Sequence, residues 1–187
     1  MENPVTQESS VAEVEALQGQ RGRSWFVRHF GLLLMVAFDA LLIDQITKRL
    51  VEATIEPYQT KVIADFLTPY FTLTHAQNTG AAFSLLTEGG VIFFVVFAVV
   101  VGMIVYFAPR LPDRDKLSKV ALGLQLGGAT GNIIDRLRIG HVTDFLHLQI
   151  PQIGFDWPVS NIADICIVAG VAILFFVSFR KDGGEAA

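Results

Sequence analysis

Besides Asp39, four aspartates stand in or beside apolar stretches of this 187-residue sequence, where carboxylates are rare. Asp44, Asp135 and Asp164 fall within or at the end of predicted membrane helices, and Asp144 follows in the connection between the last two. By topology these carboxylates gather near one membrane face. Two carboxylates held close in a low-dielectric site share one proton, so one can activate a water while the other polarises a carbonyl. This is the chemistry of an aspartyl peptidase, which requires no metal or cofactor.

Other charged groups in the apolar stretches have different interpretations. Asp44 and Lys48 are four residues apart, which places them on one helix face as a favourable ion pair, and we interpret this pair as structural. Asp164 has no Lys or Arg within helical reach in the sequence, so its carboxylate needs another explanation. Asp39 projects from a different face than Asp44; a neutral form, a hydrogen bond to another helix and contact with a partner all stay open.

Residues typical of other peptidase classes are missing. The sequence contains no His-Glu-x-x-His, no Gly-x-Ser-x-Gly and no cysteine placed with a histidine. His75, His141 and His147 match no standard metal-ligand spacing, so no metal site is predicted. The single cysteine, Cys166, lies in the last apolar stretch and is expected to be a core residue.

The elements that must position these groups are membrane helices. The chain is 52% hydrophobic and 17% charged, which is too apolar for an ordinary soluble domain of this size. Residues 91–108 carry no charge and match the apolar thickness of a bilayer; residues 30–51, 117–134 and 159–179 are of comparable length and carry isolated polar groups. We therefore predict an all-α membrane protein with four transmembrane helices.

Basic residues predict the orientation of these helices. Arginines precede the first predicted span, basic residues surround the second connection, and Arg180 with Lys181 follows the fourth span. By the positive-inside rule both termini are cytoplasmic, and the connections 52–90 and 135–158 face outward. The predicted organisation is a polar cytoplasmic tail at 1–24, a membrane domain at 25–180 and a second cytoplasmic tail at 181–187.

The outward connections contain two strand-like segments. Residues 71–75 alternate apolar and polar side chains, and residues 142–150 are a second β-type candidate, so a small extracytoplasmic sheet is predicted. In the third predicted span, Gly123, Gly127 and Gly131 recur every four residues. This stripe of small residues favours the close approach of a neighbouring helix.

Five motifs, in order over about residues 30–180, resemble those of bacterial lipoprotein signal peptidases. They are Asp44-Gln-Ile-Thr-Lys48, Asn78-Thr-Gly-Ala-Ala-Phe-Ser84, Gly127-Gly-Ala-Thr-Gly-Asn-Ile-Ile-Asp-Arg136, His141-Val-Thr-Asp-Phe145 and Asn161-Ile-Ala-Asp164. The resemblance implies four membrane helices with a small extracytoplasmic β-cradle. It also implies cleavage of a signal peptide immediately before a diacylglyceryl-modified cysteine.

By this resemblance, Asp144 and Asp164 match the catalytic aspartates of the family. Other matching positions support that pair or bind the substrate backbone: Asp44, Lys48, Asn78, Gly80, Asn132, Asp135, Arg136, Asn161 and Ala163. Asp135 is expected to be a supporting residue with Arg136 as its ion partner. Ser160 stands where the family usually has an aromatic residue, and this difference is expected to loosen packing beside the pair.

The resemblance also implies a cellular setting. It places a monomer in the bacterial cytoplasmic (inner) membrane, with its active site near the extracytoplasmic face. Its partners would be lipid-modified prolipoproteins and membrane lipids, with cyclic peptides of the globomycin type as candidate inhibitors and no nucleic acid. Two alternatives stay open: a small transporter or ion-conducting protein with a carboxylate proton relay, and a catalytically inactive family member that binds lipidated precursors or an inhibitor.

Overall fold

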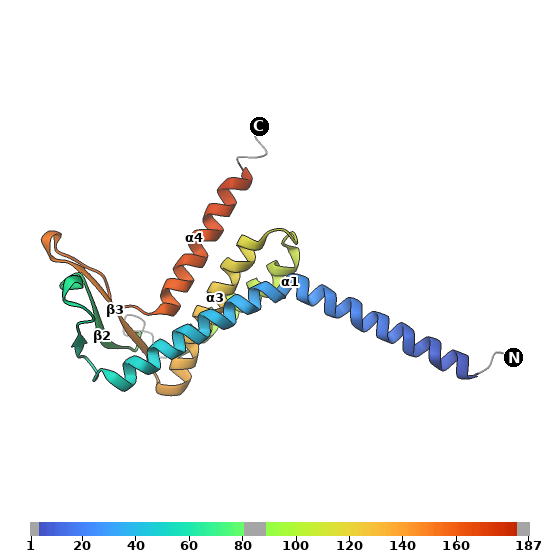
Figure 1. Cartoon of the computed structure of the whole chain (residues 1–187), viewed down its shortest axis with the longest axis horizontal. Helices are drawn as coiled ribbons and strands as arrows, with labels where there is room; N and C mark the ends of the chain where they lie inside the picture. Colours follow the sequence, from blue (N-terminus) through green and yellow to red (C-terminus); the bar gives the residue numbers. More distant parts are fainter. Residues whose placement is uncertain (1–3, 81–88, 183–187) are drawn as a thin grey trace.

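A computed structural model of the protein describes residues 4–80 and 89–182, with side chains over 24–80 and 91–179. The described residues form four α-helices and a small antiparallel sheet (Figure 1). The helices are α1 (Pro4–Thr54), α2 (Gly89–Phe107), α3 (Lys116–Ile139) and α4 (Ile162–Asp182). The strands are β1 (Thr60–Lys61), β2 (Phe71–Asn78), β3 (Val142–Ile150) and β4 (Phe155–Asp156), and short 3-10 helices are η1 (Asp65–Leu67), η3 (Ala108–Arg110) and η4 (Pro151–Ile153).

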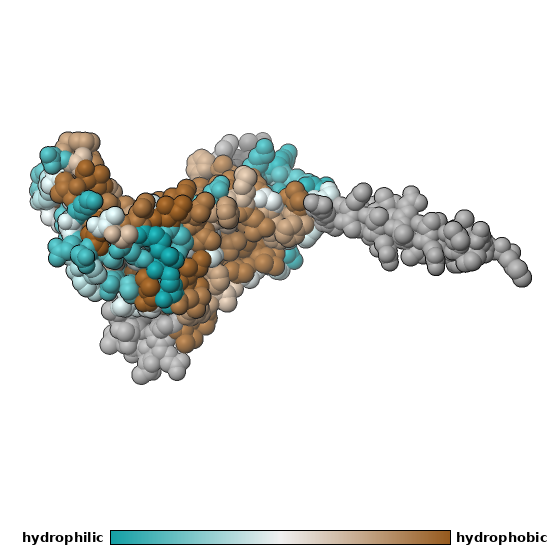
Figure 2. All heavy atoms as spheres, turned by 60° about the horizontal axis from the view of Figure 1, so that its bottom comes forward, coloured by the Kyte–Doolittle hydropathy of each residue, from teal (hydrophilic) through white to brown (hydrophobic). Residues whose placement is uncertain are grey.

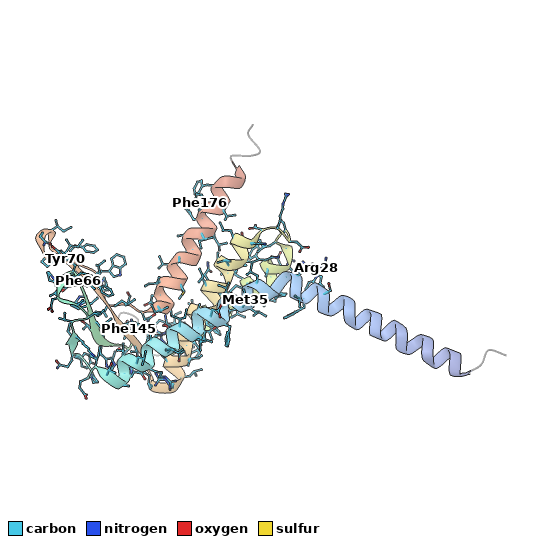
Figure 3. All side chains as sticks on the ribbon, viewed as in Figure 1. Arg28, Met35, Phe66, Tyr70, Phe145 and Phe176 are labelled. Carbon is cyan, nitrogen blue, oxygen red and sulfur yellow. The ribbon has the colours of Figure 1, made fainter. Side chains whose placement is uncertain are left out.

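Three helices in the described part are long and apolar enough to cross a membrane. They are Ser24–Thr54 within α1, Val91–Arg110 over α2 and η3, and Ile162–Phe179 within α4. α3 is less apolar than these three helices, so length and apolarity support three of the four predicted spans. Apolar side chains cover much of the outer surface of the helices, with Met35 57% and Phe176 56% exposed (Figures 2 and 3). Such a surface fits a multi-pass membrane protein.

Close helix packing follows from the small residues of α3. A Cβ at Gly123 would lie 2.6 Å from the carbonyl oxygen of Leu33, and one at Gly127 would lie 2.5 Å from that of Ala37. On its other side, α3 meets α4, since a Cβ at Gly128 would collide with the carbonyl oxygen of Ala163. Without Cβ atoms there, α3 lies directly against both neighbouring helix backbones.

The sheet has the strand order β1-β2-β3-β4, with antiparallel neighbours throughout. This confirms the small sheet predicted from residues 71–75 and 142–150. In the central pair, Phe71 lies opposite Leu148 and Ala76 lies opposite Asp144, with a shift in register between Leu73 and Ala76. Phe145, 4% exposed, packs between the sheet and the end of α1 (Figure 3). The sheet therefore sits at the end of α1, where the chain also leaves α3 and enters α4.

Candidate active site

A buried lysine lies between two buried aspartates where α1 meets α3. Lys48 Nζ is 2.9 Å from Asp44 Oδ2 and 2.9 Å from Asp135 Oδ2, and all three side chains are fully buried. We call Asp44, Lys48 and Asp135 the charge centre. The interpretation of Asp44 and Lys48 as an ion pair is therefore confirmed. The Lys48 ammonium lies between the two carboxylates, and further hydrogen-bond donors reach the carboxylates inside the fold.

The predicted ion pair between Asp135 and Arg136 is wrong. Asp135 pairs with Lys48 and lies 3.8 Å from the guanidinium of Arg138. Arg136 points to another side of α3, where its guanidinium lies 3.7 Å from the ring centroid of Phe93 and donates to the carbonyl oxygen of Asn132. Successive residues of a helix project about 100° apart, so neighbours in sequence face different partners.

Gln45 belongs to the same region, although sequence reasoning did not select it. Its amide Nε2 donates to Asp44 Oδ2 at 3.2 Å and to Asp135 Oδ1 at 3.1 Å, joining both aspartates of the charge centre. A polar residue between Asp44 and Lys48 in an apolar helix was the available signal. The backbone N–H of Ala163 completes the arrangement by donating to Asp44 Oδ1 at 2.9 Å.

The first carboxylate of the predicted catalytic pair projects from the centre of the sheet. Asp144 lies on β3 and is 2% exposed. Its Oδ2 accepts a hydrogen bond from Asn78 Nδ2 at 2.9 Å, and its Oδ1 accepts one from Asn161 Nδ2 at 2.6 Å. Burial raises the pKa of the Asp144 carboxyl from 3.8 to about 6, against the opposing effect of the Asn78 amide. Asp144 thus tends to keep a proton in weakly acidic conditions.

The second carboxylate lies in the first turn of α4. Asp164 Oδ2 accepts from the backbone N–H of Asn161 at 3.3 Å, while Asn161 Oδ1 accepts from the backbone N–H of Asp164 at 2.9 Å. This reciprocal pair is a capping box formed with Asn and Asp, and it fixes the start of the helix. The backbone of Asn161 thus sets the position of the Asp164 carboxylate.

The chain brings these two carboxylates together through the segment that links β3 to α4. The backbone of Ser160 pairs with Leu146 on β3, and α4 starts two residues after Ser160. The amide of Asn161 then reaches Asp144 while its backbone holds Asp164. Both carboxylates therefore depend on the position of one asparagine.

A second asparagine connects this pair to the charge centre. Asn132 Nδ2 donates to Asp164 Oδ1 at 2.9 Å, and Asn132 Oδ1 accepts from Lys48 Nζ at 2.8 Å. The same oxygen accepts from Asn161 Nδ2 at 3.2 Å. Lys48 thereby fixes the orientation of the Asn132 amide, so that Nδ2 of Asn132 points at Asp164.

Gly80 forms a turn beside Asn78. Its backbone N–H donates to Asn78 Oδ1 at 2.9 Å, and its φ of +71° is a conformation that glycine adopts readily. This bond leaves Asn78 Nδ2 free to donate to Asp144. The rest of this motif, residues 81–84, lies outside the described residues.

An apolar cavity of about 290 Å³ opens beside the pair between α2, α3 and α4. Phe93, Val96, Phe97 and Val100 line one wall with the spacing of a helix face. Its polar lining groups include Asn132, Arg136 and Asp164. A largely apolar substrate segment inside this cavity would have a carboxylate at its wall.

The remaining residues singled out from the sequence lie away from this pair. His75 Nδ1 lies 2.6 Å from the carbonyl oxygen of Ile55, and His147 lies between Thr74 and Asp156 on the sheet. His141 and Cys166 are each partly buried. Asp39 is exposed on the outside of α1, a different face from the buried Asp44.

The sequence matches a known protein family over most of its length. The family described as signal peptidase (SPase) II matches residues 36–180. Among curated proteins, a lipoprotein signal peptidase of Moorella thermoacetica is 44% identical over 143 residues, covering 75% of this chain and 88% of that protein. One of Bacillus subtilis is 39% identical over 154 residues, covering 82% and 96%.

Solved structures agree with this similarity. A bacterial membrane enzyme superposes with a TM-score of 0.73 at 27% identity, covering 83% of this chain and 92% of the other. A second structure with the same description gives a TM-score of 0.71 at 28% identity, covering 79% and 92%. The arrangement of helices and sheet is thus shared with known membrane enzymes.

Proposed function

Because the chain belongs to the signal peptidase II family, we infer that it is a membrane aspartyl endopeptidase that removes the signal peptides of prolipoproteins. We propose further that it cuts immediately before a diacylglyceryl-modified cysteine, with Asp144 and Asp164 as the catalytic pair. The observation that carries this assignment is the convergence of both carboxylates on the amides of Asn78, Asn132 and Asn161.

The chemistry follows from the unequal surroundings of the two carboxyls. Asp144, whose pKa burial raises to about 6, holds the proton, and in this proposal Asp164 is the base. Asp164 takes a proton from a water as the water oxygen bonds to the scissile carbonyl carbon, and Asp144 protonates the carbonyl oxygen. On collapse the C–N bond breaks, the amine takes the proton from Asp164, and the re-formed carbonyl returns its proton to Asp144.

The supporting residues hold this geometry in the proposal. Asn132 and Asn161 orient the carboxylates, and the charge centre orients Asn132 through Lys48. The contact of Asp44 with the Ala163 N–H ties α1 to the first turn of α4. Gly80 and Arg136 both lie against the ring of Phe93, and in this proposal they bind the substrate backbone. No metal or cofactor takes part in the proposed reaction.

We propose that α3 also crosses the membrane, which gives four membrane spans in total. α1 and α3 both end at the sheet, and β2 and β3 pair within it. α2 is apolar enough to span and leads away from the sheet level, so α3 must return across the same thickness. The glycine contacts of α3 with α1 and α4 support this path, because they allow α3 to run inside the bundle with its polar groups covered.

The proposed orientation follows the basic residues. Both termini are cytoplasmic, and the sheet forms an extracytoplasmic cradle that holds the catalytic pair near the outer face of the cytoplasmic membrane. Residues 1–24 and 181–187 are the cytoplasmic tails of a monomer, and 25–180 form the peptidase domain. Lipid-modified prolipoproteins and membrane lipids are its partners, and cyclic peptides of the globomycin type are candidate inhibitors.

The decisive experiment is cleavage of a diacylglyceryl-modified prolipoprotein by purified protein in liposomes containing a chelator. The native protein is expected to release the signal peptide. Asp144→Asn and Asp164→Asn should each lose at least ~100-fold in kcat/KM while staying folded, because a general acid or base is removed. The matched control is Asp113→Asn, which changes an exposed carboxylate. Full activity in either pair variant, or loss of native activity with chelator, would refute the mechanism.

A further inference from the structure

A second cavity, of about 510 Å³, lies between the sheet and the start of α4. It is separate from the cavity lined by α2 and α3, and we call it the sheet groove. The sheet groove is lined by Phe71, Leu146, Leu148, Phe155, Trp157 and Ile165. Its walls are thus apolar, although the surrounding region also contains many polar side chains (Figure 2).

The sheet groove occupies the same face of the sheet as Asp144. Side chains alternate between faces along a strand, so Leu146 and Leu148 project from β3 on the side of Asp144. Across the strand pair Phe71 lies opposite Leu148, and Phe155 of β4 lies opposite Ile150 on that face. An apolar ligand in the groove would therefore lie along β3, directly beyond the catalytic carboxylate.

Backbone groups of β3 along the floor of the groove are already paired. The N–H of Leu146 donates to Ser160, whose own N–H donates back to Leu146, and the N–H of Trp157 donates to the carbonyl oxygen of Leu148. On its other edge β3 pairs with β2. A peptide strand needs free ladder partners, whereas a hydrocarbon chain needs none. The walls and floor therefore suit an acyl chain.

One end of the groove meets the lipid-facing surface of α4. Ile165, which is 51% exposed, lies in the first turn of the span that begins at Ile162. Trp157 is 52% exposed and forms an aromatic pair with Phe155, with ring centroids 6.0 Å apart. Exposed aromatic side chains at the end of a span are typical of the membrane–water interface. A chain in the groove can thus pass into lipid along α4.

The small side chain of Ser160, at a position where the family usually has an aromatic residue, helps to keep the groove open in this chain. Its backbone is fixed by the bridge to Leu146, so the position of the side chain in the groove wall is also fixed. A large residue there would project into the space between Leu146 and Ile165. Ser160 also directly precedes Asn161, so the groove begins one residue from the site that holds both carboxylates.

We propose that the sheet groove binds an acyl chain of the substrate's lipid-modified cysteine while the scissile bond lies between Asp144 and Asp164. This inference rests on the proposed function. A lipid-modified precursor carries two apolar parts near the scissile bond, the signal sequence and the acyl chains. The cavity between α2, α3 and α4 lies among the spans and takes the signal sequence. The groove shields acyl methylenes that would otherwise meet water beside the sheet.

The test measures how cleavage depends on acyl-chain length. Full-length protein in liposomes receives one peptide whose cysteine carries either long-chain or short-chain diacylglycerol. Ser160→Phe and Leu148→Trp fill the groove from two different segments. Each should lower the ratio of kcat/KM for the long-chain over the short-chain substrate about tenfold, through lost apolar contacts. The control Ile153→Phe adds a ring at an exposed position outside the groove and should keep the native ratio.

Two results would overturn the acyl site while the proposed function stands. The ratio could stay at its native value in both groove variants, or both substrates could lose activity equally, as expected for a groove that binds peptide or bulk lipid. If the native protein cleaves neither substrate, the proposed function fails and the acyl site fails with it.

Photolabelling gives a second readout that does not need turnover. Asp164→Asn protein is irradiated with a substrate whose acyl chain ends in a photoreactive group. We expect labelled peptides from residues 146–157, and we expect Ser160→Phe to reduce that label. Labelling concentrated in residues 93–100 would place the acyl chain in the other cavity and would overturn the inference.

Discussion

Asn161 combines two roles that a substitution can separate. It caps α4 through Oδ1 and donates to Asp144 through Nδ2. Asn161→Ser keeps a capping oxygen but loses the donor, so it should lose ~100-fold in kcat/KM with a small change in Tm. Asn161→Ala should also lose about 1 kcal/mol of stability. Kinetics and thermal unfolding of the two variants check this; equal loss of Tm in both would contradict the separation of roles.

A pH profile can report the proton on Asp144. Its pKa is raised to about 6 by burial, and the Asn78 amide limits that rise. Above this pH the pair loses its shared proton, so kcat/KM should fall on the basic side of the profile. Asn78→Ala removes the donor to the carboxylate and should move this limb to higher pH. A limb that stays in place, or moves to lower pH, would contradict the assignment.

The same titration affects stability. Since folding raises the pKa of Asp144 from 3.8 to about 6, the folded state binds this proton more tightly than the unfolded chain does. The contribution of Asp144 to the free energy of unfolding is therefore complete below pH 3.8 and is lost as the pH rises through about 6.

Individual contacts were predictable only where they are local in sequence. The pair of Asp44 and Lys48 follows from a four-residue spacing on a helix. The contact between Lys48 and Asp135 joins α1 to α3, and helix spacing contains no information about it. Adjacency in sequence suggested Arg136 as the partner of Asp135, yet the two side chains leave α3 in different directions. The pairing of Asp144 with Asp164 came from the motif resemblance, not from spacing.

At the scale of elements, the glycine stripe of α3 gives a direct prediction. Gly127→Ala would place a Cβ 2.5 Å from the carbonyl oxygen of Ala37, so α1 and α3 must separate. We expect a destabilisation of about 1–3 kcal/mol, measured as a lower Tm in detergent. The matched control is Gly102→Ala in α2, where the added methyl meets nothing within 4 Å. Equal Tm changes in the two variants would contradict close α1–α3 packing.

The length of a strand or helix limits whether its sequence pattern can be recognised. β2 and β3 are 8 and 9 residues long, enough for alternation to be visible. β1 and β4 have 2 residues each and exist through pairing with those strands, so no local pattern predicts them. α3 was predicted as a span, but its charges and glycines keep it below the apolarity of the other three helices.

At the scale of the whole molecule, the orientation is testable by labelling. Single cysteines at Lys61, Arg114 and Gln152, all exposed, are introduced into a Cys166→Ala background. With a membrane-impermeant maleimide on intact spheroplasts, Lys61→Cys and Gln152→Cys should react, and Arg114→Cys should react only after lysis. This pattern also requires α3 to cross the membrane. Reaction of Arg114→Cys in intact spheroplasts would contradict the proposed topology.

Composition and basic residues were sufficient to predict a membrane protein and its expected orientation, because the bilayer imposes simple rules on length and charge. The shape of the site was not predictable in this way. The sheet groove depends on residues from β2, β3, β4 and α4, which come together only after β3 pairs with β2 and the Ser160 backbone pairs with Leu146.

The charge centre has a consequence for biogenesis. When α1 first enters the membrane, Lys48 has only Asp44 beside it, and the second carboxylate arrives with α3. The N–H of Ala163 reaches Asp44 only after α4 has been synthesised. A nascent chain released early therefore exposes the Asp44–Lys48 ion pair to lipid without the donors and packing that α3 and α4 supply, and such polar groups are costly there. These contacts distinguish a finished protein from an unfinished one, because only the complete bundle supplies every partner of Asp44 and Lys48.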